Sequence, residues 1–208
     1  ILLLSGGIRN GSLNEKLIGC AMRVVREHGL GATRLSLADY RLPLFGAEAS
    51  TVTEVPEAMA LKAMFVRHDA VIMASPEHNG SVTAMLKNAI DWISCPGEGE
   101  VPQTYAAFRR KAFGLVSASS SPFGGLRGLS QLRHILTTVQ ALVVPEQLSV
   151  PHAHRAFDAA GDLADPSLAR ILAELVQSVA FSHRRWREDA SDDNSSRSRA
   201  RCAGRPPA

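Results

Sequence analysis

The sequence predicts an α/β fold in which helices cover both faces of a doubly wound, five-stranded parallel sheet, giving a three-layer sandwich. Two observations carry this prediction. Five short strand-like segments alternate along the chain with longer segments whose apolar residues recur at helical spacing. The chain has 208 residues, of which 45% are hydrophobic, enough for one well-buried core but not comfortably for two. We therefore expect a single domain over residues 1–188 and, because apolar periodicity is then lost, a disordered tail over residues 189–208.

The first part of the chain is expected to contain two strands and two helices. The strands are placed at Ile1 to Leu4 and at Thr33 to Leu37. A helix opens at Ser12, because Ser12 and Glu15 have the spacing of a capping box. A second helix follows a Pro- and Gly-bearing connection and runs from Pro56 to Arg67. Since the first residues already form a strand and the sequence begins with Ile, we expect a few further residues to precede it.

The middle of the chain repeats the strand, loop and helix pattern. Ala70 to Ala74 is an apolar run of the kind found in a strand buried on both faces. Pro76 to Gly80 forms a turn, and a helix follows it. The core-facing stripe of that helix consists of Val82, Met85, Leu86, Ala89, Ile90 and Ile93.

The last part of the chain supplies two more strands and two more helices. Strands are expected at Ala112 to Ser117 and at about Ala141 to Val150, and the last helix at Pro166 to about Arg187. A Ser- and Gly-rich loop follows the first of these strands and ends at Gly125. The helix after this loop has an apolar face that includes Leu129, Leu132, Leu136 and Val139.

Charge and composition exclude several classes of partner. Residues 190–208 hold four Arg against two Asp, so they carry +2 of the formal net charge of +3 and leave a nearly neutral body. Binding to nucleic acid needs clustered Lys and Arg on the folded surface, and an aromatic content of 5% offers few platforms for stacked bases. The apolar runs at Ile1 to Leu4 and at Ala70 to Ala74 have four and five residues, too few to span a bilayer. We expect a cytoplasmic protein that neither spans a membrane nor binds nucleic acid.

Cysteines and histidines do not predict a metal site. Cys20, Cys95 and Cys202 are widely spaced and odd in number, which fits a reducing compartment. His152 and His154 form an HxH pair that could ligate a metal. No carboxylate or cysteine follows this pair at a suitable spacing, so a solvated strand end is the favoured interpretation.

The loop from Ser5 to Asn14 has the components of a phosphate-binding site. Its glycines permit close backbone approach, the helix start at Ser12 directs N–H groups outward, and Arg9 adds a positive charge. The adjacent Gly6 and Gly7 do not fit a dinucleotide fingerprint, and Ser12 stands where a P-loop needs its Lys. The loop therefore suits a monophosphate. The alternative is a Gly-rich turn that only caps the helix.

Two further loops follow strand ends, where ligands of doubly wound folds bind. Ser75 to Ser81 joins a rigid Pro to a turn-forming Asn-Gly, and it could carry a flat ring. Within it, Glu77 is either a general base or, the favoured interpretation, a buried turn carboxylate that accepts hydrogen bonds from backbone N–H groups. The loop from Ser117 to Gly128 could supply hydroxyls and backbone N–H groups to a ligand. Taken alone, it is better interpreted as an ordinary connection between a strand and a helix.

Three motifs contain these loops: GGIRNGSLN at Gly6 to Asn14, PEHNGSVTAMLKNAIDW at Pro76 to Trp92, and GGLRGLSQLR at Gly124 to Arg133. Together they resemble the NADPH-dependent FMN reductase family, a flavodoxin-like family that includes bacterial quinone, chromate and azo-dye reductases. The motifs occur in the family's order and at the same elements, and the resemblance covers Ile1 to Val150. The middle motif is the most specific of the three.

The resemblance implies a set of FMN-binding residues. The phosphate would be held by Arg9, Ser12, Asn14 and the backbone near Leu13. The isoalloxazine ring would pack along the second loop, that is, Pro76, Glu77, His78 and Asn79, with Gly80. Ser117, Gly124 and Gly125 would lie near the pyrimidine side of the ring or the substrate mouth. Two positions depart from the family pattern, because Gly7 stands where Ser is common and His78 where Tyr is usual. The first removes a hydroxyl from the phosphate site, and the second changes ring stacking.

The implied activity is NAD(P)H-dependent FMN oxidoreduction, with hydride passing from NADPH or NADH to bound FMN and then to a small acceptor such as a quinone. No side chain is expected to be catalytic, since the cofactor carries this chemistry. A homodimer or homotetramer is implied, with Leu129 to Val139 and the neighbouring helix as contact surface. The alternative is a flavodoxin-type electron carrier without nicotinamide turnover, although such carriers usually have strongly acidic surfaces. A regulatory protein that has lost FMN is a third interpretation, for which Gly7 is the only hint.

Overall fold

The computed structural model describes residues 1–7, 9, 11–47 and 51–182, and these residues build one five-stranded sheet. All neighbouring strands are parallel, in the order β2-β1-β3-β4-β5, which confirms the predicted flavodoxin-like fold. The predicted tail over residues 189–208 lies outside the described residues. The strands are β1 (Leu2–Ser5), β2 (Thr33–Ser36), β3 (Ala70–Ala74), β4 (Ala112–Ala118) and β5 (Leu142–Val150).

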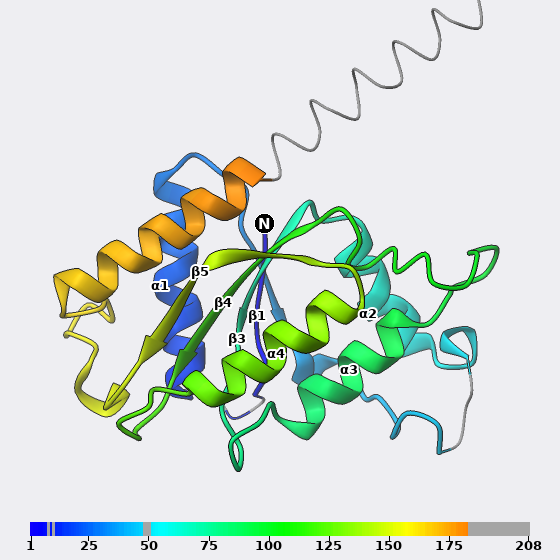
Figure 1. Cartoon of the computed structure of the whole chain (residues 1–208), viewed down its shortest axis with the longest axis horizontal. Helices are drawn as coiled ribbons and strands as arrows, with labels where there is room; N and C mark the ends of the chain where they lie inside the picture. Colours follow the sequence, from blue (N-terminus) through cyan, green and yellow to red (C-terminus); the bar gives the residue numbers. More distant parts are fainter. Residues whose placement is uncertain (8, 10, 48–50, 183–208) are drawn as a thin grey trace, which may run out of the picture.

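Helices cover both faces of the sheet (Figure 1). One face packs against α1 (Leu13–Glu27) and the helical residues 166–182, whose predicted continuation to Arg187 lies outside the described residues. The other face packs against α2 (Pro56–Val66), α3 (Ala84–Ser94) and α4 (Leu126–Thr138). The pleat divides each strand between these two cores: Leu3 joins the first core, whereas Leu2 and Leu4 join the second.

The start of α1 differs in one detail from the predicted capping box. Ser12 is the N-cap, and its hydroxyl accepts a hydrogen bond from the backbone N–H of Glu15 at 3.2 Å. The Glu15 carboxylate forms an ion pair with Arg34 on β2, and the N–H of Ser12 donates to the carbonyl of Arg9 at 3.1 Å. One half of the predicted box is therefore present. The other half is replaced by a link between α1 and the sheet.

Short 3-10 helices were not predicted. η1 (Leu37–Asp39) ends the predicted second strand at Ser36, whose hydroxyl accepts from the N–H of Ala38 at 3.2 Å and turns the chain out of the sheet. The others are η2 (Val52–Glu54) and η3 (Ala153–Arg155). Each has only three residues, too few for an apolar periodicity to be read from the sequence.

The strand order reverses between β1 and β3. Ser5 at the end of β1 is in register with Ala74 at the end of β3, so the loops that follow them leave the sheet side by side. A crevice at such a reversal is where open α/β sheets bind ligands. No helix within the described ranges is long and apolar enough to cross a membrane.

Candidate functional site

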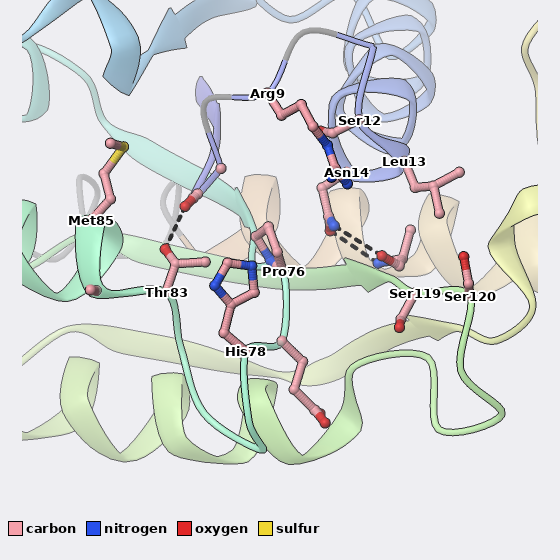
Figure 2. A pocket seen from close by; sticks show the side chains of 15 residues that line it. Arg9, Ser12, Leu13, Asn14, Pro76, His78, Thr83, Met85, Ser119 and Ser120 are labelled. Carbon is pink, nitrogen blue, oxygen red and sulfur yellow. Dashed lines mark hydrogen bonds between the residues drawn. The ribbon is translucent and has the colours of Figure 1, made fainter.

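A cavity of about 520 Å³ lies beyond the carboxyl ends of β1, β3 and β4, within the usual size range of small-molecule sites. The three loops singled out in the sequence converge on it. Figure 2 shows Arg9 and Ser12 on one side of the cavity, Pro76 and His78 on the opposite side, and Met85 and Ser119 at the flanks. The lining residues are Gly6, Gly7, Arg9, Ser12, Leu13, Asn14, Pro76, Glu77, His78, Thr83, Ala84, Met85, Ala118, Ser119 and Ser120.

The wall formed by the start of α1 is suited to an anion. The N–H of Glu15 is taken by the Ser12 hydroxyl, and no acceptor among the described residues is recorded for the N–H groups of Leu13 and Asn14. Arg9 is exposed, and no described residue is recorded as a hydrogen-bond or ion-pair partner of its guanidinium. The positive end of a 15-residue helix therefore lies beside a guanidinium that has no partner among the residues the structure describes.

The Asn14 side chain is buried and bridges two elements. Its Nδ2 donates to the carbonyl of Ala118 at 2.9 Å, and its Oδ1 accepts from the N–H of Ala118 at 3.0 Å (Figure 2). Both hydrogen bonds join the first turn of α1 to the last residue of β4. One N–H donor and one acceptor position of this amide are thus used within the protein.

Gly6 and Thr83 connect the first loop to the start of α3. The Thr83 hydroxyl donates to the Gly6 carbonyl at 2.5 Å and accepts from the N–H of Leu86 at 3.1 Å, as the N-cap of α3. A Cβ on Gly6 would lie 2.7 Å from Leu86 Cδ2, so this close approach requires glycine. Thr83 lines the cavity but was not predicted as a site residue. The helix begins only at Ala84, so Val82, which was expected in its apolar stripe, lies outside it. A Thr near the start of that stripe is the signal that could have identified the N-cap.

Gly7 contacts the second loop. A Cβ at this position would lie 3.0 Å from Cγ of Pro76, tighter than ordinary packing. The N–H of Gly7 donates to the Ser5 hydroxyl at 3.2 Å. A serine here, as the family pattern has it, would need Pro76 to move by a few tenths of an ångström.

The second loop forms a tight reversal. His78 and Ser81 exchange backbone hydrogen bonds of 2.9 and 3.0 Å, while Asn79 and Gly80 between them have φ of 51° and 79°. Positive φ at both central residues is the type I′ geometry that Asn-Gly favours, so the predicted turn is present. The His78 side chain lines the cavity, whereas Asn79 and Gly80 at the tip do not.

The Glu77 carboxylate is held by α4. Its Oε1 accepts from Arg127 Nε at 2.8 Å and its Oε2 from the N–H of Gly128 at 3.0 Å, and only 6% of the side chain is exposed. Burial alone would raise the pKa of the Glu77 carboxyl, but these two donors outweigh it and hold the pKa below its usual range. The favoured sequence interpretation, a buried turn carboxylate bonded to backbone N–H, agrees with this geometry. A carboxylate so held is a poor general base.

Three predicted residues of the third loop lie outside the cavity lining. Ser117 is fully buried, and its hydroxyl donates to the Ser75 carbonyl at 2.7 Å. Gly124 packs against Ser149, and Gly125 packs against Ser117. Ser119 and Ser120 line the cavity instead. The sequence could not distinguish these serines, because the exact end of β4 decides which of them face the crevice.

Histidines and acids do not form a metal site in the part of the chain that the structure describes. No group of three or more His, Cys, Asp or Glu side chains there could hold a metal ion. The rings of His152 and His154 pack edge to face, with centroids 6.4 Å apart.

Known proteins are similar to this chain in sequence and in fold. The sequence profile of the NADPH-dependent FMN reductase family matches residues 1–155. An NAD(P)H-dependent FMN reductase of Pseudomonas aeruginosa is 30% identical over 190 residues, covering 90% of this chain and 96% of that protein. An NADPH:quinone oxidoreductase of Arabidopsis thaliana is 30% identical over 189 residues, covering 88% and 92%.

Among solved structures, the flavoenzyme NAD(P)H:(acceptor) oxidoreductase FerB of Paracoccus denitrificans superposes with a TM-score of 0.72 at 24% identity, covering 88% of this chain and 96% of FerB. This likeness supports the fold, and the family follows from the sequence matches. The chain belongs to the NADPH-dependent FMN reductase family, flavodoxin-like oxidoreductases that combine FMN with NAD(P)H.

Proposed function

We propose that this protein takes hydride from NADPH or NADH onto FMN held in the cavity and passes the electrons to a small acceptor such as a quinone. The observation that carries the proposal is the cavity itself. It combines a helix start suited to an anion, and the exposed Arg9, with a wall formed by Pro76, Glu77 and His78. A phosphate at one end and a flat ring at the other match these two walls. Bound FMN supplies the hydride chemistry.

The residues of this chain would bind and orient rather than transfer protons. Arg9 and the N–H groups of Leu13 and Asn14 would hold the phosphate, with the Ser12 hydroxyl as a further donor. The backbone at Gly7 and the side chains of Pro76 and His78 would contact the ring. Glu77 is paired with α4, so no carboxylate of the lining is available as a general base within the described residues.

We further propose that the protein acts in the cytoplasm as a homodimer or homotetramer. Leu129, Leu132 and Leu136 are fully buried against the protein's own sheet, so a contact between copies would use the outer side of α4 instead. Sedimentation velocity at micromolar concentration tests this, and a monomer there would contradict it.

Two measurements test the proposed activity. Titration of flavin-free protein should give clearly tighter binding of FMN than of FAD, because the anion-binding wall suits one phosphate. Mixing the FMN-loaded protein with NADPH, and separately with NADH, under anaerobic conditions should bleach the flavin absorbance rapidly. Admission of a quinone should then restore it. Absence of bleaching with either coenzyme would indicate an electron carrier and reject the reductase activity.

A further inference from the structure

Helix α4 begins without a side-chain cap of its own. Its N-cap is Gly125, at φ 90°, a conformation that other residues rarely adopt. A Cβ at Gly125 would also lie 2.0 Å from the Ser117 hydroxyl oxygen. The residues that normally cap helices, Ser, Thr, Asp and Asn, are therefore excluded from this position.

Glu77 supplies the missing cap from another loop. Its Oε2 accepts from the N–H of Gly128, the third residue of α4, which is the N–H that a capping side chain usually satisfies. The negative charge of Glu77 lies at the positive end of the helix, and Arg127 in the first turn binds the other carboxylate oxygen. The capping residue and the helix are separated by about fifty residues of chain.

The turn that follows Glu77 lies directly on α4. A Cβ at Gly128 would be 3.2 Å from the Ser81 carbonyl oxygen and 3.3 Å from Glu77 Cβ, so glycine inside this helix allows the turn to approach. Glu77, which precedes the turn, and Ser81, its last residue, therefore both lie against α4. Between them, the His78 side chain lines the cavity.

We propose that Glu77 is a positioning residue, which caps α4 from the neighbouring loop and thereby fixes His78 and its turn against the ring end of the cavity. The proposal rests on the function proposed above, because it assigns the ring end to flavin. Loss of the Glu77 carboxylate should therefore weaken the contacts of the protein with the flavin ring and leave its contacts with the phosphate unchanged.

The first test uses protein without flavin. Amide hydrogen exchange is compared for the natural protein, Glu77→Ala and the matched control Glu100→Ala. Glu100 is also a mostly buried carboxylate, bonded to Lys62 Nζ at 2.5 Å and the N–H of Gly97 at 3.0 Å, but it lies outside the cavity lining. Glu77→Ala should accelerate exchange at residues 78–81 and 126–129 together, and Glu100→Ala at neither. Acceleration confined to α4, or absent, would overturn the proposal.

The second test measures ligand binding well below the melting temperature. Glu77→Ala should weaken the binding of FMN and the binding of riboflavin by the same factor, roughly 3- to 30-fold, which corresponds to the free energy of a lost helix cap. Glu77→Gln keeps an acceptor for Gly128 and should recover part of this loss, and Glu100→Gln should change neither affinity. Unchanged affinities in Glu77→Ala would show a purely structural cap. If the natural protein binds neither flavin, the proposed function fails, and hydrogen exchange alone decides whether Glu77 docks the turn.

Discussion

Arg9 is the one Arg or Lys among the described residues of the cavity lining. Arg9→Ala should weaken FMN binding by about 1.5–3 kcal/mol, the usual range for a hydrogen bond to a charged group. Riboflavin lacks the phosphate and should bind almost equally to both proteins. Fluorescence titration with the two flavins measures this. The control is Lys16→Ala, which removes an exposed charge from the first turns of α1, near Arg9 in the chain but outside the lining. Equal losses for both flavins would show that Arg9 supports the fold.

The lowered pKa of the Glu77 carboxyl makes its contribution to stability depend on pH. The charged form is stabilised in the folded protein, so its contribution is complete above the unfolded pKa of about 4.3 and is lost as pH falls through the lower folded value. Glu77→Gln should therefore reduce the free energy of unfolding by about 1–3 kcal/mol at pH 7 and by less below pH 4 or so. Urea denaturation from neutral to acidic pH measures the difference. A constant difference across that range would contradict the assignment.

At the scale of single residues, the sequence predicted residue types better than orientations. Arg9, Ser12 and His78 line the cavity, as expected from loops that follow parallel strands. Ser117 was expected there for its hydroxyl, but it points to the Ser75 carbonyl. Thr83 was missed because its capping role depends on where α3 begins. Such orientations depend on element ends, which local sequence determines only to within a few residues.

At the scale of elements, Asn14 is the link between α1 and β4. Asn14→Ala would leave the N–H and C=O of Ala118 without partners near the core, so we expect the free energy of unfolding to fall by about 2–4 kcal/mol. The matched control is Asn88→Ala. Asn88 makes a similar pair of bonds, to the Pro43 carbonyl and the Phe45 N–H, on a part of the surface where water can replace it. A smaller loss in Asn14→Ala than in Asn88→Ala, by urea denaturation, would reject this role.

Gly29 and Gly125 both have positive φ, but only Gly125 lacks space for a side chain. Comparing the two therefore distinguishes the cost of backbone strain from the cost of a steric clash. Gly29 has φ 69° and open space where a Cβ would be, so Gly29→Ala should cost about 1–2 kcal/mol. Gly125 has φ 90° and Ser117 in that space, so Gly125→Ala should cost about 1–3 kcal/mol more. Thermal and urea unfolding of both variants measure the two costs. Equal costs would mean that Ser117 moves aside freely.

Helix and strand positions were the most predictable features. The run from Ala70 to Ala74 became β3 without change, because burial on both faces leaves a continuous apolar segment. The predicted helix from Pro56 to Arg67 became α2, with Arg67 as its C-cap. The Glu15 carboxylate was assigned to Ser12, but it pairs with Arg34, which only the folded arrangement brings close. Long-range partners of this kind leave no local signal in the sequence.

At the scale of the whole molecule, the cavity joins segments that follow three different strands. A ligand held by all three is lost on unfolding, so FMN should stabilise the protein by about 2.7 kcal/mol at a concentration one hundred times its Kd. Differential scanning fluorimetry at increasing FMN should show a rising melting temperature. Riboflavin at the same multiple of its own Kd should give a similar rise. No rise with either flavin would reject the cavity as the binding site.

The cap that Glu77 provides to α4 has a consequence for how sequences of this kind can vary. Gly125 cannot become a capping residue while Ser117 fills the space beside it, so a change at Glu77 has no simple replacement within α4. Substitutions at positions 77, 125 and 128 should therefore covary among relatives, although the first lies about fifty residues from the others. The motif that contains Glu77 and the motif that contains Gly125 and Gly128 would then change together, although they are separate in the sequence.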